Sequence, residues 1–187
     1  DAGNWSTTSI WNNNAVPNSY DNVTIDHNIV IDQPSLCNNL TINSSKILTI
    51  NSGKTLTISG TLENQASSGG LVIKSDATGT GALLHNTDAV PGTVERYFTG
   101  SSNSWHLISS PIANLEISGD FTPSGSGYDF YTWHETSGLW VNKKNTTVSP
   151  TWNEANGGTT FLTGRGYMVA YEATNPTKPF AGINLHT

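Results

Sequence analysis

The sequence predicts an all-β protein, made of a short N-terminal β-solenoid (β-helix-like) followed by a small antiparallel β-sandwich. The first observation is a set of short strands that recur between residues 22 and 73. The second is a change in composition after Pro91, where four of the six Trp, five of the six Tyr and all five Phe lie. The third is the lack of any stretch with helical periodicity. We therefore predict a capped solenoid repeat over residues 1–90 and an aromatic-rich sandwich over residues 91–187.

The recurring strands share an apolar-x-apolar pattern, in most cases with Thr in the middle. They are Val23-Thr24-Ile25, Leu40-Thr41-Ile42, Leu48-Thr49-Ile50, Leu56-Thr57-Ile58 and Leu71-Val72-Ile73. Because strand side chains alternate, the outer residues of each strand face the interior and the middle residue faces solvent. Near-identical strands at near-constant spacing favour a solenoid over a meander of hairpins. The step of about eight residues between Ile42, Ile50 and Ile58 predicts two strands per coil.

The first 21 residues contain two tryptophans, Trp5 and Trp11, in a run rich in Asn, Ser and Thr. The end of a repeat stack has no neighbouring unit to cover its apolar interior. We therefore expect this aromatic pair to cap the first coil, with stacking on a ligand as the alternative.

Short strands punctuated by prolines are predicted after residue 91. They are expected at 94–98, 105–109, 128–134, 138–142, 166–171 and 180–185. The turn Glu135-Thr136-Ser137-Gly138 joins two of them in a hairpin. In that hairpin, Tyr131 and Trp133 share one face and Phe130 and Thr132 the other.

Charge and cysteine content exclude several classes of partner. The chain has 187 residues and a net charge of -6, with only eight Lys and Arg. Because clustered cations are needed to neutralise phosphates, no nucleic-acid partner is expected. No apolar run is long enough for membrane insertion. The single cysteine, Cys37, forms no internal disulfide and is predicted to be a small buried apolar residue.

No cofactor, catalytic group or metal centre is predicted. The five histidines lack the spacing of metal ligands, and no nucleophile motif is present. The weak calcium candidates are Asp21, Asp26 and Asp32, for which turn and strand-end roles are the alternative. A polysaccharide lyase or hydrolase needs converging charged groups, and the outward Thr and Asn positions of the repeat do not supply them.

Aromatic residues of the second half are the best candidates for binding. Tyr131, Trp133 and Trp152 are candidates for stacking on sugar rings, because the CH face of a sugar complements an aromatic ring. Trp152 is expected to be exposed by the neighbouring loop Asn156-Gly157-Gly158. Arg165 is a candidate partner for a sugar carboxylate, with a turn role as the alternative. Core packing is the alternative for all the aromatic residues, and it is the expectation for Trp105 and Trp140.

Four stretches resemble modules of large secreted bacterial surface proteins exported by the type IX pathway. The beginning of the chain, with Gly3-Asn4-Trp5 and Asp21-Asn22-Val23-Thr24-Ile25, looks like the start of their β-helical segments. The runs 94–97, 105–111 and 161–169 are similar to a recurring module of the same proteins. The resemblance implies a secreted, cell-surface fragment of a longer polypeptide, with neighbouring domains as its partners.

The expected function is that of a non-catalytic extracellular structural or adhesive module. Its further partners would be glycans or other copies of the chain in a fibre. The alternative is a carbohydrate-binding module that uses the aromatic residues of the C-terminal half. A lyase or hydrolase is a third hypothesis.

Overall fold

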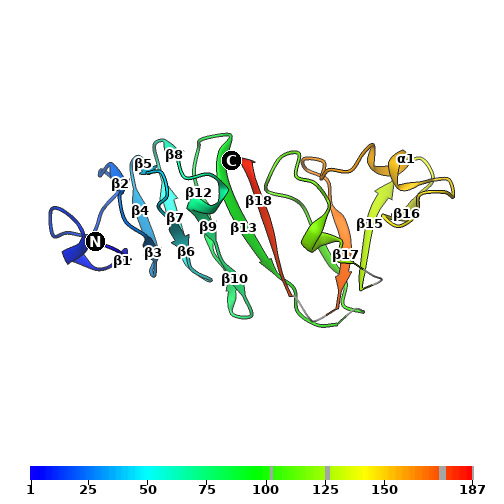
Figure 1. Ribbon diagram of the computed structural model, residues 1–187, viewed down its shortest axis with the longest axis horizontal. Helices are drawn as coiled ribbons and strands as arrows, with labels where there is room; N and C mark the ends of the chain where they lie inside the picture. Colours follow the sequence, from blue (N-terminus) through cyan, green and yellow to red (C-terminus); the bar gives the residue numbers. More distant parts are fainter. Residues whose placement is uncertain (102, 125–126, 173–175, 187) are drawn as a thin grey trace. The chain divides into compact units, whose positions relative to one another are not determined.

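The computed structural model describes residues 1–101, 103–124, 127–172 and 176–186, and these consist mostly of β-strands (Figure 1). The all-β prediction is confirmed. The chain divides into two compact units: unit 1 contains residues 1–97 and 179–187, and unit 2 contains residues 98–178.

The recurring strands of unit 1 form three sheets that we call A, B and C. Their strands, in spatial order, are β1 (Gly3–Asn4), β3 (Ile29–Ile31), β6 (Leu48–Ile50), β9 (Leu71–Ile73), β13 (Val90–Tyr97) and β18 (Thr177–Leu185) in sheet A; β2 (Val23–Ile25), β5 (Leu40–Ile42) and β8 (Leu62–Asn64) in sheet B; and β12 (Ala82–Leu84), β7 (Thr55–Ile58) and β4 (Ser35–Cys37) in sheet C. The strands of sheets B and C, and those of sheet A from β1 to β13, pair in parallel. A small antiparallel hairpin, β10 (Ser75–Asp76) with β11 (Gly79–Thr80), follows β9. The short 3-10 helix η2 (Ser68–Gly70) precedes β9.

The chain visits sheets B, A and C in turn, and we call one such passage a coil. The strands β2, β3 and β4 form one coil, and β5, β6 and β7 form the next. There are thus three strands per coil, and the prediction of two was wrong. Ile42, Ile50 and Ile58 end strands in three different sheets, so their spacing measures the step from one sheet to the next. Coil length also varies, because the step along the chain from Val23 to its partner Leu40 is shorter than the step from Leu48 to its partner Leu71.

The sequence pattern did not identify strand β4, the third strand of the first coil. Its inward residues are Ser35 and Cys37, and its middle residue Leu36 is 43% exposed. The large apolar side chain therefore stands at the outward position, opposite to the pattern of the other strands. Cys37 is 1% exposed, which confirms that it is buried.

The interior of unit 1 is a stack of Ile and Leu side chains. In sheet A, Ile31, Ile50 and Ile73 are in register and are at most 5% exposed. The middle residues of the same strands, Val30, Thr49 and Val72, are partly exposed, as are Thr41 and Thr57 in sheets B and C. The predicted alternation of inward Ile or Leu with outward Thr is thus observed.

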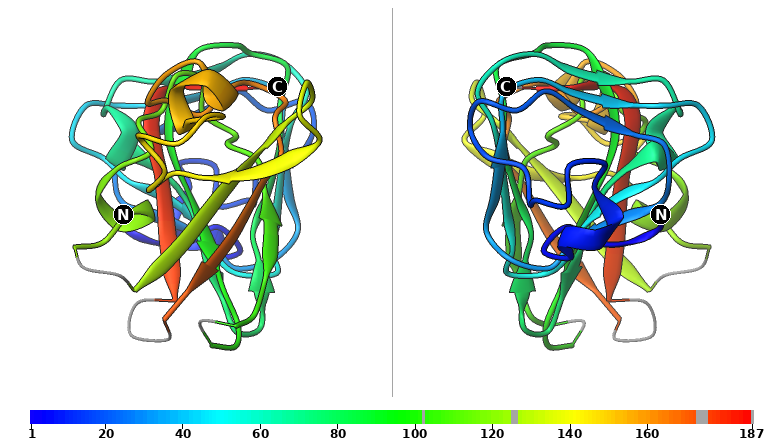
Figure 2. Two further views of the ribbon diagram at one scale, coloured as in Figure 1. Left: turned by 90° about the vertical axis from the view of Figure 1, so that its right-hand side faces the viewer. Right: turned by 90° about the vertical axis from the view of Figure 1, so that its left-hand side faces the viewer.

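The first 21 residues close the beginning of the stack. Strand β1 adds to sheet A beside β3, and Trp5 is fully buried. The 3-10 helix η1 (Thr8–Ile10) leads to Trp11, whose Nε1 donates to the carbonyl oxygen of Trp5 over 2.9 Å. The right-hand view of Figure 2 shows this segment across the end of the coils. Trp5 is therefore a buried residue at the beginning of the stack, whereas its predicted partner Trp11 is partly exposed.

The division into units differs from the predicted boundary at residues 90 and 91. Pro91 and Gly92 belong to β13, which is part of sheet A. Pro91 precedes Thr93 and Val94, which pair with β9, and a proline at the start of a strand is compatible with such pairing. The chain leaves sheet A after β13 and returns to it as β18. Unit 2 is therefore an insertion between two neighbouring strands of unit 1.

Unit 2 contains a four-stranded antiparallel sheet and a short helix. The strand order is β14 (His106–Ile108), β17 (Tyr167–Tyr171), β15 (Tyr128–His134) and β16 (Leu139–Asn142). The predicted hairpin is confirmed, with Trp133 opposite Trp140. The described residues of unit 2 hold one sheet and an isolated bridge between Glu116 and Thr160, so the two-sheet sandwich is not confirmed.

One face of this sheet packs on the core of unit 2. Phe130 is fully buried and contacts Trp152 and Phe161 edge to face. Trp152 begins the helix α1 (Trp152–Asn156), which was not predicted from the sequence. The side chains of Thr151 and Glu154 each accept a hydrogen bond from the other residue's backbone N–H, and these bonds cap the start of the helix. In the sequence, the Thr-x-x-Glu pattern is typical of a helix start. The 3-10 helix η3 (Gly119–Phe121) supplies the buried Phe121.

Candidate functional site

The candidate site lies on the other face of the four-stranded sheet in unit 2. On β15, Phe130 and Thr132 are fully buried, whereas Tyr131 and Trp133 are partly exposed. The predicted alternation along this strand is therefore observed. It directs Tyr131 and Trp133 to the face opposite the core.

Neighbouring strands add four more large side chains to this face. Met168 pairs with Tyr131 and with Leu107, and Trp140 pairs with Trp133. Trp105 precedes β14 and contacts the ring of Tyr131. We call the six residues together the outer aromatic face: Trp105, Leu107, Tyr131, Trp133, Trp140 and Met168.

Several of these side chains are strongly exposed. Leu107 is 73% exposed, Trp105 is 48% exposed and Trp140 is 40% exposed. Trp105 and Trp140 were expected to be core residues, and that expectation was wrong. The core lies on the opposite face because Phe130 packs there against Trp152 and Phe161.

Four of the aromatic rings form two edge-to-face pairs. The ring centroids of Trp105 and Tyr131 are 5.7 Å apart, and those of Trp133 and Trp140 are 5.5 Å apart. Each such pair contributes about 0.5–1.5 kcal/mol beyond the burial of its area. The pairs therefore restrain the orientation of the rings before any ligand binds.

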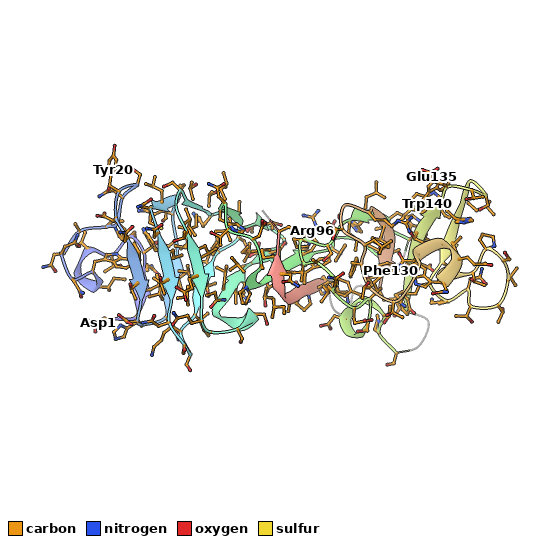
Figure 3. The ribbon with its side chains drawn as sticks, turned by 90° about the horizontal axis from the view of Figure 1, so that it is seen from above. Asp1, Tyr20, Arg96, Phe130, Glu135 and Trp140 are labelled. Carbon is orange, nitrogen blue, oxygen red and sulfur yellow. The ribbon has the colours of Figure 1, made fainter. Side chains whose placement is uncertain are left out.

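Polar groups border the outer aromatic face. The Nε1 of Trp133 donates to Oε2 of Glu135 over 3.0 Å, and Nδ2 of Asn142 donates to Oδ1 of Asp129 over 3.0 Å. The Nζ of Lys144 lies 3.9 Å from the Asp129 carboxylate and 4.4 Å from the ring centroid of Tyr128. Figure 3 labels Trp140 and Glu135 close together near the tip of the hairpin, with Phe130 elsewhere in the unit.

Trp152 does not belong to this surface. It is 5% exposed, and its Nε1 donates to the carbonyl oxygen of Gly158 over 2.9 Å. The glycine-containing loop was expected to expose this ring. Instead, Gly157 ends α1 in the left-handed conformation, and the loop turns back to accept the hydrogen bond. Lys143 contributes a cation–π contact to the same ring, with its Nζ 5.3 Å from the centroid.

Arg165 lies on the inner side of the sheet. Its Nη1 donates to the carbonyl oxygen of Ala155 over 2.6 Å and to Oγ1 of Thr132 over 3.2 Å. Because Thr132 faces the core, Arg165 is on the side opposite to Tyr131. It links helix α1 to strand β15, and the structure does not bring it together with Tyr131 and Trp133.

Asp21, Asp26 and Asp32 each accept separate hydrogen bonds. Asp21 accepts from Asn18, Asp26 from Asn43, and Asp32 from the backbone N–H and hydroxyl of Ser6. In the described part of the chain, no three His, Cys, Asp or Glu residues are grouped as a metal site would require. Partial burial, the largest single influence, raises the pKa of Asp32, but the hydrogen bonds from Ser6 together lower that pKa below its usual value.

The sequence contained signals for the missed members of the face. The hairpin register sets Trp140 opposite Trp133, and cross-strand pairs share a face. Side chains alternate along Trp105-His106-Leu107-Ile108, so Trp105 and Leu107 share one face. Because Ile108 is buried on the core face, that shared face is the outer one. Both signals become useful only once the core face of the sheet is known.

Comparison with known proteins gives a family without an assigned activity. A family model described as a domain of unknown function, DUF8693, matches residues 1–184. The chain belongs to the DUF8693 family. No curated protein and no solved structure matches it. Among the residues of this family member that the structure describes, no helix has the length and apolar character needed to cross a membrane.

Proposed function

We propose that the chain is a non-catalytic adhesive module of a secreted bacterial surface protein. In this proposal unit 1 is a short β-solenoid that acts as a scaffold, and unit 2 binds carbohydrate through its outer aromatic face. The neighbouring domains of the same polypeptide are its covalent partners. The resemblance of several stretches to type IX secreted proteins supports the extracellular location.

The strand pairing supports the solenoid. Successive strands run through sheets B, A and C, and equivalent strands of neighbouring coils pair in parallel. Polar side chains at the corner between sheets C and B also connect each coil to the next one along the stack. Asn39 donates from Nδ2 to Oδ1 of Asn22 over 2.8 Å and accepts from the backbone N–H of Thr61 over 2.7 Å. Such stacking gives a rigid element suited to holding another unit.

The outer aromatic face is the observation that carries the binding role. It combines two ring pairs of fixed orientation with Leu107 and Met168, on a sheet whose other face is a packed core. Exposed aromatic rings next to hydrogen-bonding groups suit sugars, which have both apolar CH faces and hydroxyl groups. The Glu135 carboxylate and the Asn142 amide are at its border.

A glycan array tests this function. The wild type is compared with Tyr131→Ala, and Tyr20→Ala is the matched control because Tyr20 is 89% exposed in unit 1 (Figure 3). We expect binding to at least one glycan class that is lost in Tyr131→Ala and retained in Tyr20→Ala. The absence of glycan binding by the wild type would remove the proposed carbohydrate role.

Self-association through the same face is the competing outcome, because exposed apolar faces of this kind also join protein copies. Sedimentation of the wild type and Tyr131→Ala distinguishes the two. We expect a monomer in both cases. A wild-type dimer that Tyr131→Ala converts to monomer would assign the face to protein contacts.

A further inference from the structure

We infer that the outer aromatic face binds a neutral glycan chain and discriminates against acidic polysaccharides. This inference rests on the proposed carbohydrate-binding function and names the class of ligand. The charged groups around the face and the arrangement of the two ring pairs support it.

Carboxylates outnumber cations on this side of the sheet. Asp129 is on β15 with the same alternation as Tyr131, Glu135 follows the strand, and Glu172 follows β17 with the alternation of Met168. The cation at this border is Lys144, and it already contacts the Asp129 carboxylate and donates to the Tyr128 carbonyl oxygen. A polyanionic glycan would therefore meet like charges, which repel it.

The other charged and titratable groups near the sheet are directed elsewhere. Lys143 contacts Trp152 and Arg165 contacts Ala155 and Thr132, all on the core side. His106 is in contact with the buried ring of Phe98, and its Nε2 contacts the carbonyl oxygen of Thr99. Lys178 is 2% exposed, and its Nζ lies 4.6 Å from the ring centroid of the buried Tyr171. Among the Lys and Arg residues in the described part of unit 2, Lys144 is thus the one at the outer face, and it already pairs with Asp129.

The same carboxylates suit a neutral sugar. A carboxylate that accepts a hydrogen bond from a hydroxyl group makes a short, charge-assisted contact. Glu135 is held beside the Trp133–Trp140 pair by the indole N–H of Trp133. A sugar ring stacked on that pair would have an acceptor at its edge.

The two ring pairs lie next to each other along the strand. Tyr131 and Trp133 are two residues apart on β15, which corresponds to about 6.8 Å. This spacing is of the order of one sugar unit, so consecutive units of a chain can each contact one pair. We therefore expect an extended oligosaccharide to bind more tightly than a monosaccharide.

Affinity electrophoresis with two soluble polysaccharides tests the inference. The probes are a neutral β-linked glucan and polygalacturonate, each at low and high salt. We expect the wild type to bind the neutral glucan at least about tenfold more tightly than the polygalacturonate, with little dependence on salt. Glu135→Gln keeps an acceptor oxygen for Trp133 but removes the charge. We expect it to raise the affinity for polygalacturonate, because a like charge is removed. We expect it to lower the affinity for the neutral glucan, because the charge-assisted hydrogen bond from a sugar hydroxyl becomes a neutral one.

The outcomes separate the inference from the proposed function. Equal or tighter binding of polygalacturonate by the wild type would overturn the neutral-ligand inference and leave carbohydrate binding in place. Binding of neither probe, together with a blank glycan array, would reject both. Neutral binding that survives in Tyr131→Ala would reject the assigned face.

Discussion

The stacked core of unit 1 predicts a large difference between two adjacent residues of β6. Ile50 is fully buried between Ile31 and Ile73, its partners in the neighbouring strands of sheet A. Thr49, the residue before it, is partly exposed on the outer side of the same strand. Replacing each residue with Ala therefore compares the inner and outer faces at one position of the stack.

The expected cost of Ile50→Ala is about 4 kcal/mol. Removing three carbon groups from a buried site costs about 2.4 kcal/mol at 0.8 kcal/mol per group. The coils above and below hold the surrounding side chains in place, and the resulting cavity adds about 1–2 kcal/mol. Thr49→Ala removes an outward side chain, so we expect a change within about 0.5 kcal/mol.

Urea denaturation monitored by circular dichroism measures both values. The midpoint for Ile50→Ala should fall well below that of the wild type, whereas the midpoint for Thr49→Ala should stay near it. Similar losses in the two variants would show that the inward and outward assignment is incorrect. A loss of less than about 1 kcal/mol for Ile50→Ala would refute a tightly packed interior.

Three further predictions concern the cap, the buried thiol and the inserted unit. The hydrogen bonds from Ser6 lower the pKa of Asp32 in the folded state, so the stability that they contribute is fully present above the unfolded pKa of about 3.9 and is lost as the pH falls through the lower folded value. An acid titration of tryptophan fluorescence should show this loss in the wild type and not in Asp32→Ala. Identical titrations of the two proteins would exclude a role for this contact. Burial raises the pKa of Cys37 to about 12, with a smaller contribution from Asp21, so a thiol reagent at mildly alkaline pH should react with the protein only as unit 1 unfolds; rapid reaction of the native protein would contradict the burial. Replacing residues 98–178 with a short Gly-Ser linker should leave unit 1 folded with a cooperative thermal transition, because β13 and β18 are neighbours in sheet A; a variant without such a transition would mean that unit 1 needs the insertion.

Local alternation explains what the sequence predicted well. The positions of Ile50 and Thr49, and of Phe130 and Tyr131, follow from a period of two residues that needs no knowledge of distant contacts. The hairpin followed from its turn residues in the same way. These features account for most of the strands and for two residues of the candidate site.

Long-range packing explains what the sequence did not predict. The inward side of β4 carries Ser35 and Cys37. Cys37 was expected to be buried, but only the parallel pairing with β7 identifies the strand and the interior position of Ser35. Trp105 precedes a short strand and Trp152 begins a short helix, yet Trp105 is 48% exposed and Trp152 is 5% exposed. Their difference depends on Phe130 and Phe161, which select the core face of the sheet from distant parts of the chain.

The most direct test of the proposed function is a calorimetric titration with a neutral β-glucan oligosaccharide. The wild type, the double variant Trp133→Ala/Trp140→Ala and the control Tyr20→Ala are titrated in parallel. The two substitutions remove one ring pair of the outer face, and the rings of this pair contact each other edge to face on the side of the sheet opposite the core. We predict that the wild type and the control bind the oligosaccharide with equal affinity, and that the affinity of the double variant is at least about tenfold lower. Equal affinity of the double variant and the wild type would contradict the assignment of carbohydrate binding to the outer aromatic face.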